Sequence, residues 1–373
     1  MKGRAEIAGA GFAGLTAAIA LSQRGWTVRV HEVASELRAF GAGIYIWENG
    51  LRVLAAIGAY DAVVAGAHEA GVYETRHDNR VVGAHEFAMA ACGTRMLTMT
   101  RQHLYAAIVA AAARAGVEVA TRSEVVGAAP EGVLLTADGE RHRADLVIGA
   151  DGVKSRVRDS LGLLKERHVY DDGIVRVLGP RLKHELGPGP WDHVIDFWSF
   201  EPRLLRVLYT PCDEQDLYLA MMAPVNDREA SSIPINVDIW TKSFPQLAPV
   251  IRAVGPRGRY DPYETTKALR WSAGRVAIVG DSAHAMAPTL GQGAGTAMMN
   301  ALALAVAVER SASVEAALDA WERAERPLTE HTQDCSAGAA KGRRFSGQGV
   351  WNDETLRTAR HVPTGTGRVD FTN

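Results

Sequence analysis

The sequence predicts an α/β protein, in which a Rossmann-like domain with a parallel sheet carries an inserted domain built on an antiparallel β-sheet. Three observations lead to this expectation. The first 32 residues have the pattern of a strand, a glycine-rich turn, a small-residue helix and a second strand. Two later apolar strands, 145–148 and 275–279, end in similar small-residue turns. Between 166 and 264 proline, tryptophan and tyrosine become frequent and strand patterns dominate, so a separate sheet is expected there.

The N-terminal unit has the order of elements that a nucleotide fold requires. Ile7 and Ala8 end a short strand, the turn Gly9-Ala10-Gly11-Phe12-Ala13-Gly14 follows, and 15–24 has a helical composition. Residues 27–32 then alternate with the period of two that is typical of a strand. A GxGxxG pattern between a strand and a helix indicates a dinucleotide-binding turn.

Each glycine of this turn has an expected role. Gly9 permits the tight turn, Gly11 lets the backbone approach a pyrophosphate, and Gly14 lets the helix pack closely against the strand. The helix that starts here presents free N–H groups and a partial positive charge to phosphates. Glu32 ends the second strand and can accept hydrogen bonds from both hydroxyls of an adenosine ribose. The expected dinucleotide contacts are Gly9, Gly11, Phe12, Ala13, Gly14 and Glu32.

Further elements follow from hydrophobic period and turn residues. Extended segments are expected at 72–75, 81–85, 96–100, 117–121, 133–136, 194–200, 204–209 and 217–222. Helices are expected at 49–57, 101–115, 292–309 and 314–325, whereas roughly the last 40 residues are polar and weakly patterned. The first domain is expected to comprise 1–70, 96–165 and 265–330, the inserted domain 71–95 and 166–264, and a C-terminal helix and tail 331–373.

The two later turns each carry an acidic residue at the end of a buried strand. Asp151 and Gly152 follow the first of these strands, and Gly280 and Asp281 follow the second. Because the carboxyl ends of parallel strands meet at one sheet edge, both carboxylates are expected beside polar parts of an extended cofactor. A dehydrogenase that binds NAD in the N-terminal unit would not normally need these two motifs.

Charge, hydrophobic pattern and cysteine spacing indicate which partners and which cell compartment to expect. The net charge of −2 favours neither nucleic acid nor a charged membrane as partner. The most apolar late stretch, 290–308, is broken by glycines and polar residues, whereas a membrane-spanning helix needs roughly 20 apolar residues. Cys92, Cys212 and Cys335 have no metal-ligand spacing and are expected to be buried free thiols. Since no signal-peptide pattern is present either, we expect a soluble cytoplasmic protein without a bound metal.

Together, the three turns described above resemble those of the class A flavoprotein monooxygenases, the aromatic hydroxylases of the p-hydroxybenzoate hydroxylase type. The resemblance extends to about residue 330 and implies that the dinucleotide is FAD. It implies that Asp281 contacts the ribityl chain and the pyrophosphate region. It also implies that Asp151 and Gly152 serve both FAD and the nicotinamide coenzyme, and that Arg38 and Arg101 contact FAD.

The loop at 288–295 matches the loop that lies under the flavin in this family. Its glycines permit close approach, and the helix that follows would point free N–H groups at the isoalloxazine, where they would stabilise the anionic reduced flavin. Only one GxGxxG turn is present, which disfavours flavoenzymes that hold the nicotinamide coenzyme in a second such fold. The loop residues expected to contact FAD are Pro288, Gly291, Gln292, Gly293 and Ala294.

The resemblance also implies the reaction. NADH or NADPH would reduce FAD, and dioxygen would then oxygenate a small hydroxylated aromatic acid through a flavin C4a-hydroperoxide. The stretches 36–45, 73–75, 206–209 and 217–219 are similar to the hydroxypyridine-carboxylate oxygenases of the family. This similarity implies a substrate such as 2-methyl-3-hydroxypyridine-5-carboxylate, which would be hydroxylated and then ring-opened.

Tyr73, Arg206 and Tyr218 are the candidate catalytic residues, because the narrower resemblance places these positions in the substrate pocket. A hydroxypyridine carboxylate needs one cation and hydroxyl partners in an otherwise apolar cavity. Tyr218 would orient the ring hydroxyl or modulate its proton. Arg206 would hold the acid or an active-site water, since a buried arginine without an anionic partner is costly. The full set of expected substrate contacts is Tyr45, Tyr73, Arg206, Tyr218 and Pro288.

Other interpretations stay open at this point. A hydroxylase of the hydroxynicotinate, salicylate or hydroxybenzoate type would carry the same motifs, and the three candidate residues can also be ordinary sheet residues. A flavin-binding protein without turnover predicts yellow protein without substrate-dependent oxygen uptake, and an NAD-dependent dehydrogenase predicts colourless protein. His284 can be a base, although a packed, hydrogen-bonded histidine is favoured. The sequence does not distinguish NADH from NADPH, or a monomer from a homo-oligomer.

Overall fold

The computed structural model describes residues 3–39, 41–87, 94–347 and 349–367. Its central sheet has six strands in the order β18-β19-β12-β1-β2-β8, and all of them are parallel except the short edge strand β18. The strands are β1 Arg4–Ala8, β2 Thr27–His31, β8 Glu118–Ala120, β12 Leu146–Gly149, β18 Ser272–Ala273 and β19 Val276–Ile278. This sheet confirms the predicted α/β class, with the N-terminal strand at its middle.

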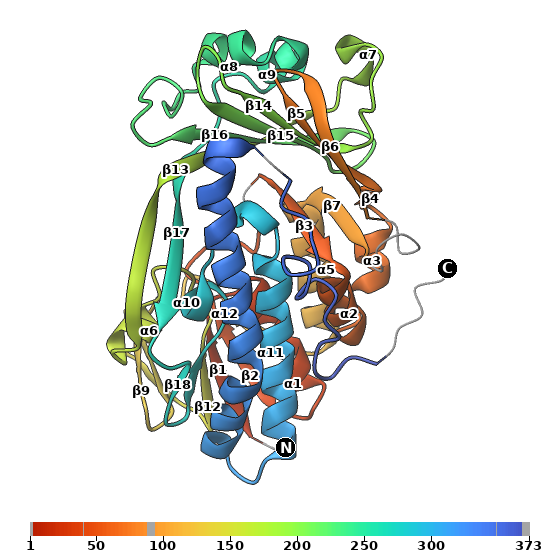
Figure 1. The fold of residues 1–373 in the computed structure, drawn as a ribbon. Coiled ribbons are helices and arrows are strands. Elements are labelled where there is room, and N and C mark those ends of the chain that lie inside the picture. Colours follow the sequence, from red (N-terminus) through yellow and green to blue (C-terminus); the bar gives the residue numbers. More distant parts are fainter. Residues whose placement is uncertain (1–2, 40, 88–93, 348, 368–373) are drawn as a thin grey trace.

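Helices cover the central sheet. In α1 (Phe12–Ser22) every residue from Ala13 to Leu21 is buried, as expected of a helix that is apolar all round and lies inside the protein. It packs against α11 (Gly293–Arg310) and α5 (Arg101–Arg114), and α12 (Val314–Ser346) lies along α11 (Figure 1). Within the part of the chain that the structure describes, no helix combines the length and the apolar character needed to cross a bilayer.

A second, seven-stranded sheet forms the upper part of the molecule in Figure 1, with α8 (Val237–Ser243) and α9 (Ala248–Val254) over its outer face. Its order is β17-β13-β16-β15-β14-β5-β6. All neighbours in it are antiparallel except β14 and β5, which run parallel. The strands are β5 Val72–His77, β6 Arg80–Glu86, β13 Leu164–Pro180, β14 Val194–Ser199, β15 Leu205–Pro211, β16 Asp216–Pro224 and β17 Tyr260–Ala268.

The two faces of this sheet have different surroundings. Because successive side chains of a strand point to opposite faces, Val207, Leu219 and Met221 pack into the core under α8 and α9. The alternate positions, such as Tyr218 and Ala220, belong to a cluster on the inner face. The inner face therefore points toward the central-sheet part of the protein.

Two three-stranded sheets and several short helices complete the fold. One small sheet lies against the central sheet and the other joins the two large parts. Their strands are β9 Val125–Ala129, β10 Val133–Thr136, β11 Arg141–Arg143, β3 Gly43–Trp47, β4 His68–Glu69 and β7 Met96–Thr100. The short helices are α2 Glu48–Ala56, α3 Tyr60–Val64, α6 Arg156–Ser160, α7 Lys183–Leu186 and α10 Asp281–His284, with 3₁₀ turns at Pro245–Leu247 and Pro288–Leu290.

The last long helix differs from the prediction. We expected a helix over 314–325 and a separate C-terminal helix and tail within 331–373, but α12 is one helix that continues through Pro327 to Ser346. The buried side chains of its second half are polar, namely Thr332, Gln333 and Ser336. Gln333 Nε2 donates to the carbonyls of Thr266 and Ala285, at 2.9 Å each. Hydrophobic period cannot detect a buried face that is satisfied by hydrogen bonds.

β13 and β17 connect the two large parts of the protein. The expected boundaries near 166 and 264 fall inside these two strands, which pair with each other from Leu164 to Val175. At one end β13 pairs with β16 in the seven-stranded sheet, and at the other Leu163 and Ala268 belong to the core of the central sheet. Both expected boundaries therefore fall within continuous strands, and the division into two domains stays a prediction.

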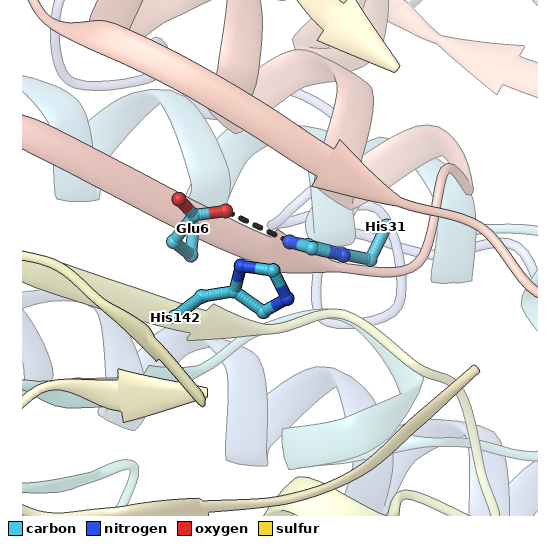
Figure 2. Close-up of side chains that lie close together, drawn as sticks. All are labelled: Glu6, His31 and His142. Atoms are coloured by element: carbon cyan, nitrogen blue, oxygen red, sulfur yellow. Dashed lines mark hydrogen bonds and ion pairs between the residues drawn. The ribbon is translucent and has the colours of Figure 1, made fainter. Parts of the chain in front are cut away.

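A buried hydrogen-bonded pair lies between the central sheet and β9–β11. Figure 2 shows Glu6 of β1, His31 of β2 and His142 of β11 lying close together. His31 Nε2 lies 2.8 Å from Glu6 Oε2, and the other carboxylate oxygen accepts from Arg4 Nε at 2.7 Å. Burial alone would raise the pKa of Glu6, but the hydrogen bonds from His31 and Arg4 and their charges lower it below its ordinary value of 4.5. A carboxylate cannot donate, so the His31 ring carries its hydrogen on Nε2.

We expect Glu6→Gln to lower the free energy of unfolding at pH 7 by about 1.5–3 kcal/mol, the range for hydrogen bonds to a charged group. Since the folded pKa of Glu6 is lowered, its contribution is complete above pH 4.5 and is lost as the pH falls through the folded value. The difference between wild type and variant should therefore shrink at low pH, measured by urea unfolding at pH 7 and at pH 4 or below.

The matched control is Glu118→Gln, which removes an exposed ion pair with Arg29 in the same sheet. It should change stability by less than about 1 kcal/mol. Equal stabilities of Glu6→Gln and wild type at pH 7 would contradict this account of the pair.

Candidate active site

A cavity of about 360 Å³ lies where the carboxyl ends of the central strands face the inner side of the seven-stranded sheet. From the central part it is lined by the turns after β1, β12 and β19, and from the other part by β13, β15, β16 and β17. An edge of this kind is where open α/β sheets bind their ligands. The structure thus brings most of the predicted site residues to one place.

The three glycines of the turn after β1 have two different roles, close packing and space for a ligand. A Cβ on Gly9, which has φ +96°, would lie 2.4 Å from the carbonyl oxygen of Ala150, and one on Gly14 would lie 2.0 Å from the carbonyl oxygen of Gly9. A Cβ on Gly11 would meet nothing within 4 Å, and Gly11, Phe12 and Ala13 line the cavity. Gly9 and Gly14 therefore permit the close packing, whereas Gly11 leaves space for a ligand.

The N-terminus of α1 has the properties of an anion-binding site. No side chain caps it, and its first turn contains no acidic residue. The first N–H groups of a helix lack partners within the helix, and here they lie at the cavity. A phosphate group fits these donors and the positive end of the helix.

Glu32 and Arg38, which were predicted to contact the dinucleotide, do not line the cavity. Glu32 accepts hydrogen bonds from the backbone N–H groups of Ala10 and Ala34, at 2.9 Å each, so its carboxylate fixes the glycine-rich turn. Arg38 is exposed and is absent from the cavity wall. Glu32 does lie at the end of β2 beside the turn, where the adenosine end of an extended dinucleotide would reach.

Asp151 also bonds within the protein. One of its carboxylate oxygens accepts from the backbone N–H groups of Arg156 and Val157, at 2.7 and 3.1 Å, at the start of α6. The other accepts from the hydroxyl of Ser282 at 3.1 Å. Gly152, rather than Asp151, lines the cavity. The acidic residue of this motif thus ties the turns after β12 and β19 together.

Asp281 and Arg101 place opposite charges in the cavity wall. The Asp281 side chain is exposed to the cavity although it lies deep in the molecule. Desolvation raises the pKa of Asp281, and the charge of Arg101 opposes this shift. Desolvation likewise lowers the pKa of Arg101, whose guanidinium lies 4.9 Å from the centre of the Phe12 ring. This pair suits the polar chain and the phosphates of a dinucleotide.

The loop after α10 presents a second helix N-terminus. Gly291 adopts a left-handed conformation with φ +60°, and a Cβ there would lie 3.1 Å from Tyr45 Cβ. The N-terminus of α11 has no side-chain cap, and Gly293 and Ala294 line the cavity together with Pro288 and Gly291. Gln292 turns away, since its amide donates to the carbonyl of Thr355 at 2.7 Å, and it is not part of the cavity wall.

Arg206 has an anionic partner of its own, contrary to the expectation that a substrate acid would supply one. Arg206 Nε donates to Oδ1 of the fully buried Asp196 at 2.5 Å. Arg206 Nη2 donates to the hydroxyl of Tyr73 at 3.4 Å, and the guanidinium lies 5.1 Å from the centre of a Trp198 ring. Arg206 and Tyr73 both line the cavity. Asp196 therefore sets the direction of Arg206 and neutralises its charge.

Tyr218 and Tyr45 line the cavity as phenols that burial keeps protonated. Burial raises the pKa of Tyr218, against the charges of Arg176 and Arg101 and a hydrogen bond with Arg176. Burial also raises the pKa of Tyr45, whose hydroxyl shares a hydrogen bond with Thr210. Both phenols can orient a ring hydroxyl, and neither is a base near neutral pH.

The wall residues that were not predicted include Arg176, Tyr263 and Trp351. Arg176 pairs with Asp261 at 3.0 Å. It lies on β13, on the same face as Ile174 and Leu178. The period of two along the strand could have indicated this face, but the strand itself was not predicted. Trp351 comes from the C-terminal region, which showed no pattern.

His284, Cys212 and Cys335 lie outside the cavity wall. His284 is buried, and burial lowers its pKa to about 4. Asn300 Nδ2 lies 3.0 Å from His284 Nε2, so the ring accepts there and is a packed histidine rather than a base. Cys212 is buried, but Cys335 is only half-buried, which differs from the prediction. Cys92 lies outside the described residues.

Comparison with known proteins agrees with this geometry. A family model described as "FAD binding domain" matches residues 4–336. A solved structure of the tetrameric form of 2-methyl-3-hydroxypyridine-5-carboxylic acid oxygenase is 49% identical, with a TM-score of 0.94 and 98% of each chain covered. A protein of Rhodococcus erythropolis named putative 2-heptyl-3-hydroxy-4(1H)-quinolone synthase is 40% identical over 97% of each chain. The 6-hydroxynicotinate 3-monooxygenase of Pseudomonas fluorescens is 30% identical over 81% of each chain.

These similarities confirm the predicted family, fold class and FAD cofactor. The family model spans the glycine-rich turn, both later motifs and the loop before α11. The uncapped starts of α1 and α11 and the space beside Gly11 fit FAD on independent, structural grounds. The chain is an oxidoreductase and belongs to the FAD-dependent aromatic monooxygenases.

Proposed function

We propose that this enzyme uses NADH or NADPH and dioxygen to oxygenate a small hydroxylated N-heteroaromatic acid such as 2-methyl-3-hydroxypyridine-5-carboxylate, with opening of the ring. One observation carries the proposal: a single cavity joins the dinucleotide turns to the Tyr73–Arg206 pair and Tyr218. The 49% identity to the oxygenase of that acid over 98% of both chains supports this substrate class.

The cofactor would lie along the edge formed by the three turns. When bound, FAD supplies the redox chemistry, since it accepts electrons from the nicotinamide coenzyme and activates dioxygen. Gly11 and the start of α1 would hold the pyrophosphate, and Asp281 and Arg101 would bind the polar chain next to it. The start of α11 at Gly293 would stabilise negative charge on the ring system.

The substrate ring would lie against the inner face of the seven-stranded sheet. Tyr218 would orient the ring hydroxyl, and the nearby cations Arg176 and Arg101 would favour loss of the hydroxyl proton, which makes the ring more electron-rich. Since Asp196 already neutralises Arg206, Arg206 and Tyr73 would act as aligned donors to the acid or to an ordered water. The apolar residues between them exclude water from the reacting ring.

A second candidate substrate is a 2-alkyl-4-quinolone. The specific observation is the 40% identity to a protein named putative 2-heptyl-3-hydroxy-4(1H)-quinolone synthase over 97% of both chains. The apolar lining by Leu208, Ala220 and Met222 is compatible with such a ring. We also propose a homo-oligomer, supported by the tetrameric form of the similar oxygenase and testable by light scattering.

Substrate-stimulated coenzyme oxidation tests the proposed function. Purified, FAD-loaded protein is expected to oxidise NADH or NADPH and to take up oxygen faster with a hydroxypyridine carboxylate than with hydroxynicotinate, salicylate or hydroxybenzoate. A ring-opened product in mass spectra would support the full reaction. Yellow protein without substrate-dependent oxygen uptake, either with these acids or with a 2-alkyl-4-quinolone, would rule the proposal out in favour of a non-catalytic flavoprotein.

Gly11→Ala is expected to weaken FAD binding without loss of fold stability. The added Cβ meets no protein atom within 4 Å, but it enters the space assigned to the pyrophosphate. We expect at least a tenfold rise in the Kd for FAD, equivalent to about 1.4 kcal/mol, with an unchanged melting temperature of the apoprotein. Gly14→Ala is the matched comparison, because its Cβ would lie 2.0 Å from the carbonyl oxygen of Gly9; it should lower the melting temperature as well. Normal FAD affinity in Gly11→Ala would contradict the placement.

Asp196→Asn is expected to reduce kcat/KM for the ring acid about 10- to 100-fold, because a charge-assisted hydrogen bond that directs Arg206 contributes about 1.5–3 kcal/mol. The Kd for FAD should not change, which separates positioning of Arg206 from general damage. Asp319→Asn, which removes an exposed partner of Arg270, is the control and should behave as wild type. An unchanged kcat/KM in Asp196→Asn would argue against a role of Arg206 in substrate binding.

A further inference from the structure

The C-terminal segment 349–361 supplies part of the cavity wall although it lies beyond the family match, which ends at residue 336. Trp351 is the residue of this segment that lines the cavity. None of the motifs that define the cofactor site lies in this segment. Its contribution to the site therefore lies outside the region that the family model describes.

Hydrogen bonds hold the segment in a defined position. The backbone N–H of Asn49 in α2 donates to the carbonyl of Ala359 at 3.0 Å. The hydroxyls of Thr332 and Thr358 lie 2.7 Å apart, and Leu356 and Ala359 are fully buried. Gln292 adds its bond to the carbonyl of Thr355 and so connects the segment to the loop before α11. The segment is thus anchored on three sides.

Trp351 lies in an aromatic cluster that connects the loop before α11 with the Tyr73–Arg206 pair. Its ring centre is 5.1 Å from that of Trp47, 5.2 Å from that of Tyr73 and 5.4 Å from that of Phe87. Trp47 Nε1 donates to the carbonyl of Leu290 at 3.2 Å, and Tyr73 contacts Arg206. Trp47 and Phe87 are almost fully buried, so the layer behind Trp351 leaves little room for a substituent.

We propose that Trp351 limits the length of the ring substituent that the cavity accepts, and so determines specificity for a compact ring. The inference rests on the proposed function. A methyl group fits in front of an aromatic wall, whereas a heptyl chain would have to displace Trp351 from its contacts with Trp47, Tyr73 and Phe87. Close-packed interiors accommodate such a change poorly. Removal of the indole would open apolar space that a chain can fill.

Chain-length discrimination tests the role of Trp351. The probes are 2-methyl- and 2-heptyl-4(1H)-quinolone, which share one ring and differ only in the alkyl chain, titrated into FAD-loaded protein by the change in flavin absorbance. Wild type should bind the methyl compound more tightly. In Trp351→Ala the ratio of the Kd values, methyl over heptyl, should rise about tenfold or more, because burial of each methylene is favourable.

Three variants and one control make the result specific. Trp351→Phe keeps an aromatic wall and should stay within about threefold of the wild-type ratio. Trp351→Leu provides a second enlarged cavity should Trp351→Ala fail to fold. Arg357→Ala changes an exposed residue of the same segment and should leave the ratio unchanged. Melting temperature and FAD content are measured for each.

Two outcomes would overturn the inference. Wild-type protein that binds the heptyl compound as tightly as the methyl compound would show that Trp351 sets no limit. An unchanged ratio in folded Trp351→Ala and Trp351→Leu would show the same. A different result would contradict the proposed function, namely no coenzyme oxidation stimulated by the pyridine acid. The ratio of the two Kd values can be measured in either case.

Discussion

The close contact between backbone turns at the sheet edge is the constraint on which the site depends. Gly9, Gly14 and Ala150 approach so closely that two of these positions have no space for a side chain. This contact brings the start of α1 and the turn after β12 to one place, and the helix start remains uncapped. Unpaired N–H groups at that point have to find a ligand or water, which makes the edge a binding surface before any specific side chain is considered.

The alternation of side chains between the two faces of the seven-stranded sheet completes the site. β13, β15 and β16 each give one set of residues to the core beneath α8 and α9 and the other set to the cavity. Arg206 and Tyr218 can therefore be polar without disturbing the core, provided that their polar atoms are paired. Asp196 provides that pairing for Arg206 inside the protein. Orientation in the cavity thus depends on a buried carboxylate that no ligand needs to touch.

Local signals in the sequence predicted the parts of the site that depend on local backbone conformation. The turn at 9–14, the motif around Asp281 and the loop before α11 combine glycine with a strand end or a helix start, and all three line the cavity. The partners of the polar side chains could not be predicted, because they depend on how strands and turns pack: Asp196 for Arg206, the backbone of α6 for Asp151, and the turn for Glu32. Trp351 was missed because buried polar residues replace the hydrophobic period along α12, which precedes it.

The uninterrupted path of β13 and β17 has a mechanical consequence. Their paired backbones run from the core of the central sheet to the face that carries Arg176. The ladder shifts register between Val169 and Gly173. Bending the two large parts away from each other on this side would have to be absorbed at that irregularity, because the regular pairing on either side of it resists bending. β13 and β17 therefore stiffen the frame around the cavity along their regular stretches.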